Sequence, residues 1–171
     1  MLNRDIYQKD PSTRKLVNEG VASVNDEKTN QALSVLRYEL ETFVCDGQYE
    51  KGLEHILDVY LKNIEQAEQP AVWVSGFYGS GKSHLVKMLR ALWVDSAFDD
   101  GATARGIANL PQGVSDQLKE LSTQAKRHGG LHAASGTLGS SSRDNYKTYR
   151  SYLNQVNTVG LPEQYPAARF V

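Results

Sequence analysis

Between residues 27 and 66 the hydrophobic residues recur every three or four positions, the spacing of one face of an α-helix. Asp46 and Gly47 interrupt this pattern near its middle, and Pro70 follows the point where it decays. Either Asp26 or Thr29 can cap the first helix. The pattern therefore predicts a pair of helices over 27–66. Its hydrophobic positions are Leu33, Leu36, Leu40 and Phe43, then Leu53, Ile56, Leu57, Tyr60, Leu61 and Ile64.

The pattern changes at residues 71–75, where five residues form an apolar run rich in β-branched and aromatic side chains. A proline precedes the run and a glycine follows it, which favours a buried strand. After the glycine-rich stretch 76–83, helical spacing returns and predicts a helix over 82–93. We therefore expect the order strand, glycine loop, helix, preceded by the helical pair.

The remaining stretches give weaker patterns. Residues 95–113 suit an irregular connection with a short helical turn, and Val114 to Ala125 indicates a helix. Residues 131–139 fit either a second strand or a flexible loop, and residues 146–156 indicate a further helix. We expect residues 1–26 to be an N-terminal segment in which Val21–Val24 can form a short strand. Residues 27–171 are expected to be one domain.

Residues 76–83 match the full pattern G-x-x-x-x-G-K-[ST], the phosphate-binding P-loop or Walker A motif. Gly79 and Gly81 can adopt backbone angles closed to other residues, and they let phosphate oxygens approach the main chain. The loop amides and the start of the following helix then face the phosphates. In this interpretation the Lys82 ammonium lies between the β- and γ-phosphates as the catalytic group, and the Ser83 hydroxyl binds Mg²⁺.

We therefore predict a site for ATP and Mg²⁺. Its expected nucleotide contacts are Gly76, Phe77, Tyr78, Gly79, Ser80, Gly81, Lys82, Ser83 and His84. The alternative is a glycine-rich turn between strand and helix with a solvated lysine.

Several side chains in and near the motif have ordinary structural explanations. Phe77 and Tyr78 are not required for phosphate binding, and we expect them to pack on neighbouring elements rather than to stack on a base. His84 directly follows Ser83, and a local hydrogen bond on the helix face is favoured over sensing of the nucleotide. Cys45 lies among hydrophobic positions, which favours a core residue over a nucleophile.

The acidic residue that hydrolysis requires is missing from the sequence. A P-loop ATPase usually holds its metal with an acid at the end of a neighbouring strand, but no apolar run after residue 83 ends in Asp or Asp-Glu in that context. We therefore expect this chain to be the N-terminal part of a larger ATPase, truncated before the acidic strand. The less favoured alternative is a protein that binds nucleotide without hydrolysing it. On its own, this chain is expected to bind nucleotide weakly or not at all and to show no turnover. The guanine-binding pattern Asn-Lys-x-Asp is also absent.

Bulk composition excludes a few classes. The chain has 171 residues, of which 40% are hydrophobic and 23% charged, as in ordinary globular proteins. Its net charge of −1 gives no general attraction to nucleic acid or to anionic membrane. No apolar run approaches the roughly 18 residues that span a bilayer, and the single cysteine rules out an internal disulfide. These features favour a cytoplasmic location.

Three segments resemble the N-terminal part of the BREX-system P-loop ATPases, the family of BrxC and PglY. They are residues 10–24, residues 47–53 (GQYEKGL) and residues 74–89 (VSGFYGSGKSHLVKML). The resemblance covers about the first 95 residues well and the rest loosely. It implies an α/β, AAA-like P-loop NTPase fold, with a sheet that is incomplete in this chain and an acidic motif beyond Val171.

The resemblance also implies a function. Members of this family are large bacterial anti-phage ATPases, so the chain would belong to a defence complex that distinguishes host from phage DNA by methylation. The implied partners are other BREX proteins, including the methyltransferase, the phosphatase-like component and small subunits. Further partners on this view are DNA, reached through the complex, and a phage-encoded inhibitor. The full-length protein could also form a homo-oligomer. No interaction with a membrane is implied. The alternative is a nucleotide-dependent assembly module with little hydrolysis, or a fragment whose helical pair docks a partner whatever the nucleotide.

Overall fold

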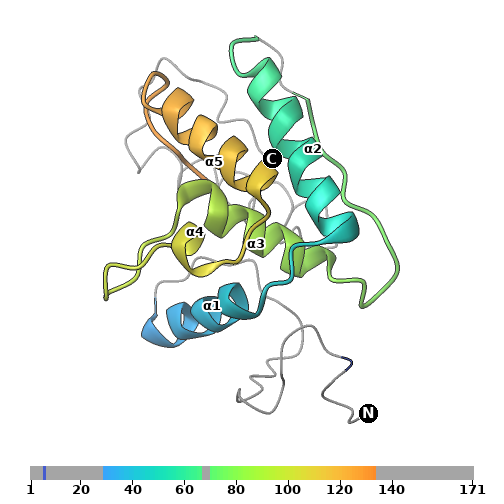
Figure 1. The fold of residues 1–171 in the computed structure, drawn as a ribbon, viewed down its shortest axis with the longest axis vertical. Helices are drawn as coiled ribbons and strands as arrows, with labels where there is room; N and C mark the ends of the chain where they lie inside the picture. Colours follow the sequence, from blue (N-terminus) through green and yellow to red (C-terminus); the bar gives the residue numbers. More distant parts are fainter. Residues whose placement is uncertain (1–5, 7–28, 67–69, 134–171) are drawn as a thin grey trace, which may run out of the picture.

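The computed structural model describes Ile6, residues 29–66 and residues 70–133. The described part is built from helices (Figure 1). In chain order these are α1 Asn30–Thr42, α2 Gly47–Asn63, α3 Lys82–Val94, α4 Ala104–Ile107 and α5 Gln112–Ala125. The predicted short strand Val21–Val24 and the predicted helix at 146–156 lie outside the described residues, as do residues 134–139.

Two helices occupy the stretch where the hydrophobic spacing predicts a pair. Thr29 caps α1, because its hydroxyl accepts a hydrogen bond from the Ala32 amide at 3.2 Å. The chain leaves α1 at Phe43 and enters α2 at Gly47, whose φ of +53° suits a residue without a side chain. These local signals are the ones that the sequence shows, so both helices agree with the expectation.

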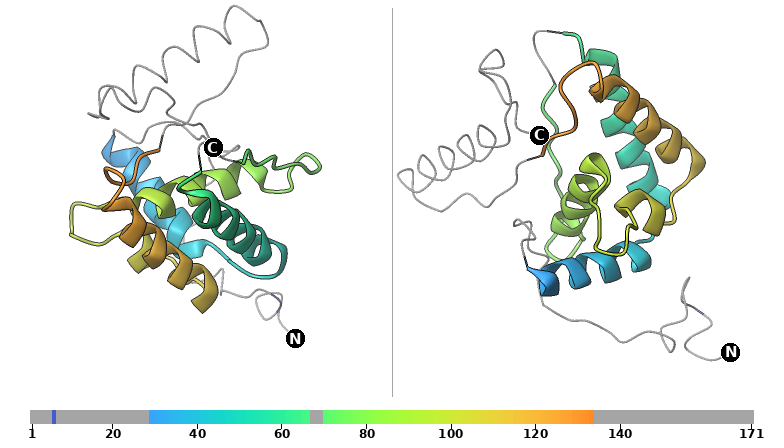
Figure 2. Two further views of the ribbon diagram at one scale, coloured as in Figure 1. Left: turned by 90° about the horizontal axis from the view of Figure 1, so that it is seen from above. Right: turned by 90° about the vertical axis from the view of Figure 1, so that its left-hand side faces the viewer.

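The two helices do not form a tight hairpin. The main partner of α2 is α5, while α1 packs against α4. Figure 2 shows α1 lying across one end of the α2–α5 pair, with α3 and α4 between them. The core is the space that these helices enclose. Its largest fully buried side chains are Leu36, Leu40, Leu53, Leu57, Met88, Leu92, Val114, Leu118 and Leu121.

Arg105 on the short helix α4 joins two longer helices. Its guanidinium donates to the Leu92 and Trp93 carbonyls at the end of α3, at 2.7 and 2.9 Å. It also donates to the Leu118 carbonyl and the Ser122 hydroxyl of α5, at 2.8 and 2.6 Å. Carbonyls at a helix end have no partner within the helix, so this side chain both caps α3 and ties it to α5.

A buried ion pair joins α1 to α3. The Lys87 ammonium lies 2.6 Å from the Glu39 carboxylate, and their side chains are only 7% and 17% exposed. A charge this far from water is tolerated when an opposite charge is in contact with it. The pair therefore constrains how α3, and the loop before it, is placed against α1.

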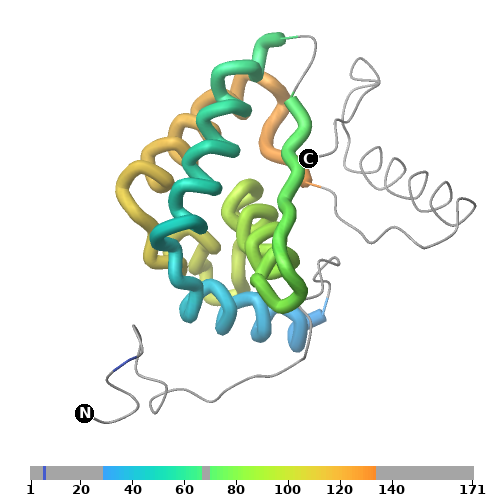
Figure 3. Tube along the Cα trace, turned by 90° about the vertical axis from the view of Figure 1, so that its right-hand side faces the viewer, coloured from blue at the N-terminus to red at the C-terminus, as the bar shows by residue number. Residues whose placement is uncertain are grey.

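The predicted α/β, AAA-like P-loop NTPase fold is wrong for the part of the chain that the structure describes. Residues 71–75, predicted to be a buried strand, run as a single extended segment beside α2 (Figure 3). The β-pairing within the described ranges is one isolated antiparallel bridge between Ala97 and Thr103. Trp73 is 90% exposed, so the segment is not buried either.

The physical reason is that a strand is defined by its partner. An apolar, β-branched run has the composition of a strand, but a single strand gains neither ladder hydrogen bonds nor a sheet face to pack. Among the described residues no second strand lies beside it. The described part is therefore a helical assembly, and none of its helices is long and apolar enough to cross a membrane.

Candidate functional site

The glycine-rich loop connects the extended segment to the N-terminus of α3. Gly79 and Gly81 have φ values of +78° and +80°, left-handed conformations that favour glycine. The Ser80 amide donates to the Phe77 carbonyl at 3.2 Å and closes a turn, and the Leu85 amide donates to the Gly81 carbonyl at 2.9 Å as the helix begins. Gly79 and Gly81 thus occupy positions whose backbone conformation favours glycine.

Four amides at this turn have no acceptors within the described residues. Gly79, Gly81, Lys82 and Ser83 donate no backbone hydrogen bond there, and no side chain caps the N-terminus of α3. Uncapped amides at a helix start carry partial positive charge and attract anions. The loop can therefore offer several donors to one phosphate-sized anion.

The Lys82 ammonium lies across the same loop. It donates to the carbonyls of Gly76 and Phe77 at 2.9 and 2.6 Å, and it is 3.4 Å from the Ser80 hydroxyl. No carboxylate among the described residues forms an ion pair with it. Within the described residues its charge therefore meets carbonyl and hydroxyl oxygens rather than a carboxylate.

Tyr49, on the first turn of α2, also contacts the loop. Its hydroxyl donates to the Ser80 carbonyl at 3.0 Å, and a Cβ placed on Gly81 would overlap with that hydroxyl. Gly81 is thus required both by its φ and by the space that Tyr49 occupies. Sequence reasoning missed this residue. Its presence in the segment GQYEKGL, which carries part of the family resemblance, was the available signal.

The aromatic residues of the loop point into solvent. Phe77 is 90% exposed and Tyr78 is 96% exposed. Our expectation that they pack on neighbouring elements is wrong for the described part, because the loop extends beyond the helices and offers them no surface. Ser83 is exposed as well, so its hydroxyl is accessible to a metal ion from solvent.

His84 differs from the rest of the motif, because its ring packs into the helical assembly. The ring centroid lies 5.8 Å from that of Phe43. Burial lowers the pKa of His84, Glu39 opposes that change, and Lys87 adds to it. The imidazole is therefore neutral at pH 7. Through its contact with Phe43, the side chain helps to pack α3 against the residue that follows α1.

Cys45 lies in the link between α1 and α2, and it is buried. Burial, together with the nearby charges of Glu50, Asp46 and Glu54, raises the pKa of the thiol to about 11. A thiol that stays protonated at neutral pH is a poor nucleophile. The residue is part of the core, as its sequence position indicates.

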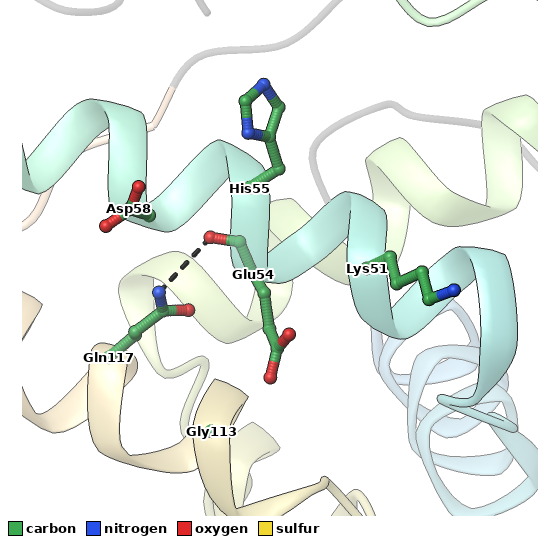
Figure 4. A pocket seen from close by; sticks show the side chains of 6 residues that line it. All are labelled: Lys51, Glu54, His55, Asp58, Gly113 and Gln117. Carbon is green, nitrogen blue, oxygen red and sulfur yellow. Dashed lines mark hydrogen bonds between the residues drawn. The ribbon is translucent and has the colours of Figure 1, made fainter.

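A second surface feature lies between α2 and α5 (Figure 4). It is an open depression of about 540 Å³. Two of its lining residues are joined by a hydrogen bond of 3.2 Å, which the Gln117 side chain donates to the Glu54 carbonyl. Its lining residues are Lys51, Glu54, His55, Asp58, Gly113 and Gln117. It combines both signs of charge on a shallow surface, so it lacks the enclosed, convergent character of a ligand site.

No protein-family model matches this chain, and no solved structure matches it. The case for a function therefore depends on the loop geometry and on the sequence motif.

Proposed function

We propose that this chain binds ATP with Mg²⁺ through the loop Gly76–Ser83. The observation that carries the proposal is that, within the described residues, the amides of Gly79, Gly81, Lys82 and Ser83 have no acceptor and the neighbouring Lys82 ammonium has no carboxylate partner. A phosphate group can accept from these donors together, and the left-handed Gly79 and Gly81 let its oxygens approach the main chain.

The residues present fit this ligand. The loop amides would hold phosphate oxygens, and Lys82 would exchange the Gly76 and Phe77 carbonyls for phosphate. Ser83 would supply a hydroxyl to Mg²⁺, which prefers oxygen ligands and keeps several waters. The bound metal would neutralise charge on the phosphates.

Hydrolysis makes a further demand. After the loop, the sequence has no apolar run ending in an acidic residue that could hold the metal. For this chain we therefore propose nucleotide binding, with turnover only where an acidic residue from elsewhere completes the site. This favours, as a second candidate, a module in which bound nucleotide controls assembly and hydrolysis is minor.

The wider role that we propose is that of a cytoplasmic ATPase component of a bacterial BREX anti-phage complex. The support is the resemblance of residues 10–24, 47–53 and 74–89 to the BrxC and PglY family. The proposed partners are the BREX methyltransferase, the phosphatase-like component and the small subunits, with DNA reached through the complex.

The test is a calorimetric or fluorescence titration of the chain with MgATP, carried to millimolar concentration because the expected affinity is weak. The variant Lys82→Ala removes the ammonium, and Lys119→Ala removes a surface ammonium on α5 that pairs with Asp116. We expect saturable binding by the wild type and by Lys119→Ala, and at least about tenfold weaker binding by Lys82→Ala. Equal binding by all three proteins would contradict the proposal.

A second experiment, with BREX partner proteins, distinguishes an ATPase role from an assembly role and from nucleotide-independent docking. An ATPase role predicts phosphate release that is lost in Lys82→Ala. An assembly role predicts partner binding that depends on nucleotide without matching phosphate release. If Lys82→Ala retains partner binding under all conditions, the helical pair docks the partner whatever the nucleotide.

A further inference from the structure

The Tyr49 hydroxyl is placed by two rigid contacts. Its backbone belongs to the first turn of α2, where its amide donates to the Asp46 carbonyl at 3.0 Å. Its ring meets the buried Phe43 ring edge-on, with centroids 6.3 Å apart and planes at 81°. The hydroxyl therefore has little freedom to leave the Ser80 carbonyl.

That hydrogen bond determines the direction of the next amide. The carbonyl of Ser80 and the N–H of Gly81 belong to one peptide unit, which is planar and trans. The two groups consequently point in opposite directions. With the carbonyl directed at Tyr49, the Gly81 N–H points away from α2, and within the described residues it meets no acceptor.

We infer that Tyr49 is a positioning residue for phosphate binding, acting through the Ser80–Gly81 peptide. By holding the Ser80 carbonyl, it keeps the Gly81 amide aimed where an anion can accept from it. The inference rests on the proposed function, since it concerns the same loop. A flip of this peptide changes ψ of Ser80 and φ of Gly81, and glycine tolerates a wide range of φ. A flip would present a carbonyl to the phosphate instead of an N–H.

The test compares Tyr49→Phe with the wild type. This change removes the hydroxyl and keeps the ring that packs on Phe43, so the fold is retained. Tyr60→Phe is the matched control, because it makes the same change on α2 at a ring that packs against Trp93 with centroids 4.5 Å apart. We expect Tyr49→Phe to weaken MgATP affinity about fivefold, the loss of one neutral hydrogen bond, and Tyr60→Phe to leave it unchanged.

A second readout needs no nucleotide. In ¹⁵N spectra of the unliganded proteins, Tyr49→Phe should shift or broaden the Gly81 amide resonance while its melting temperature stays near that of the wild type. A hydroxyl that only fills space beside Gly81 could shift this resonance but would leave the MgATP affinity unchanged, so the two readouts are interpreted together. Tyr60→Phe should leave the Gly81 resonance in place.

The outcomes distinguish a failure of the positioning role of Tyr49 from a failure of nucleotide binding. If the wild type binds MgATP and Tyr49→Phe binds it equally or more tightly, the inference is overturned while the proposed function survives. If the wild type shows no binding, the proposed function fails, and an unchanged Gly81 resonance in Tyr49→Phe then overturns the peptide orientation as well. Weaker binding with a moved Gly81 resonance supports both.

Discussion

Replacing Arg105 with alanine tests how the helices that carry the loop are held together. The guanidinium makes four hydrogen bonds, to two carbonyls at the end of α3 and to two oxygens of α5. Burial lowers the pKa of this arginine while Asp95 opposes that change, so the folded chain already bears a desolvation cost that those bonds offset.

The magnitude follows from what the change leaves behind. Hydrogen bonds from a charged donor contribute about 1.5–3 kcal/mol each, but the four are not additive. The Leu118 carbonyl keeps the Ser122 hydroxyl as a donor at 3.2 Å, whereas the Leu92 and Trp93 carbonyls lose a helix-end partner. We therefore expect Arg105→Ala to lower the free energy of unfolding by about 3 kcal/mol.

The assay is urea unfolding followed by circular dichroism, analysed by linear extrapolation. Arg105→Lys keeps the charge but cannot reach both helices with one ammonium, so its midpoint should lie between those of the wild type and Arg105→Ala. Arg37→Ala is the control, because that arginine makes exposed ion pairs with Asp100 and Glu41 and should unfold near the wild-type midpoint. If Arg105→Ala unfolds no earlier than Arg37→Ala, the bridging role assigned to Arg105 is wrong.

Four further outcomes follow from the buried groups. In the folded chain the Cys45 thiol should react with a disulfide reagent far more slowly at pH 8 than it does in urea, because it is buried and its pKa is raised to about 11. Its protonated form favours the folded state, so that contribution is complete below about pH 9 and is lost as the pH rises through about 11, which unfolding curves at each pH would detect. Lys87→Met should cost about 3–5 kcal/mol by leaving Glu39 buried without its partner, and the double variant Lys87→Met, Glu39→Gln should recover part of that loss in a mutant cycle. Leu57→Ala, at a fully buried position, should cost about 3 kcal/mol in urea unfolding, and a change below about 1 kcal/mol would contradict its place in the core.

The helices could be predicted because their signals are local. Hydrophobic spacing, the Thr29 cap and the break at Gly47 all lie within a few residues of the elements that they define. The prediction of a strand at 71–75 was wrong for the opposite reason. Its composition is local, but pairing depends on a second strand that the described residues do not place beside it.

In the candidate site, too, local features could be predicted from the sequence and contacts between distant residues could not. The motif located the loop and the start of α3, since eight adjacent residues carry the pattern. Tyr49 lies 31 positions before Ser80, and Arg105 reaches a residue 17 positions away. Such contacts depend on how the helices cross, which no single stretch of sequence specifies. The exposure of Phe77 and Tyr78 depends in the same way on the surfaces that surround the loop.

The most direct test of nucleotide binding at this loop is to map where MgATP contacts the chain. In a ¹⁵N amide titration we expect saturable shifts concentrated at Gly79, Gly81, Lys82 and Ser83, and we expect Lys82→Ala to abolish them. Shifts centred on the depression between α2 and α5, or no saturable shift at millimolar MgATP, would contradict it.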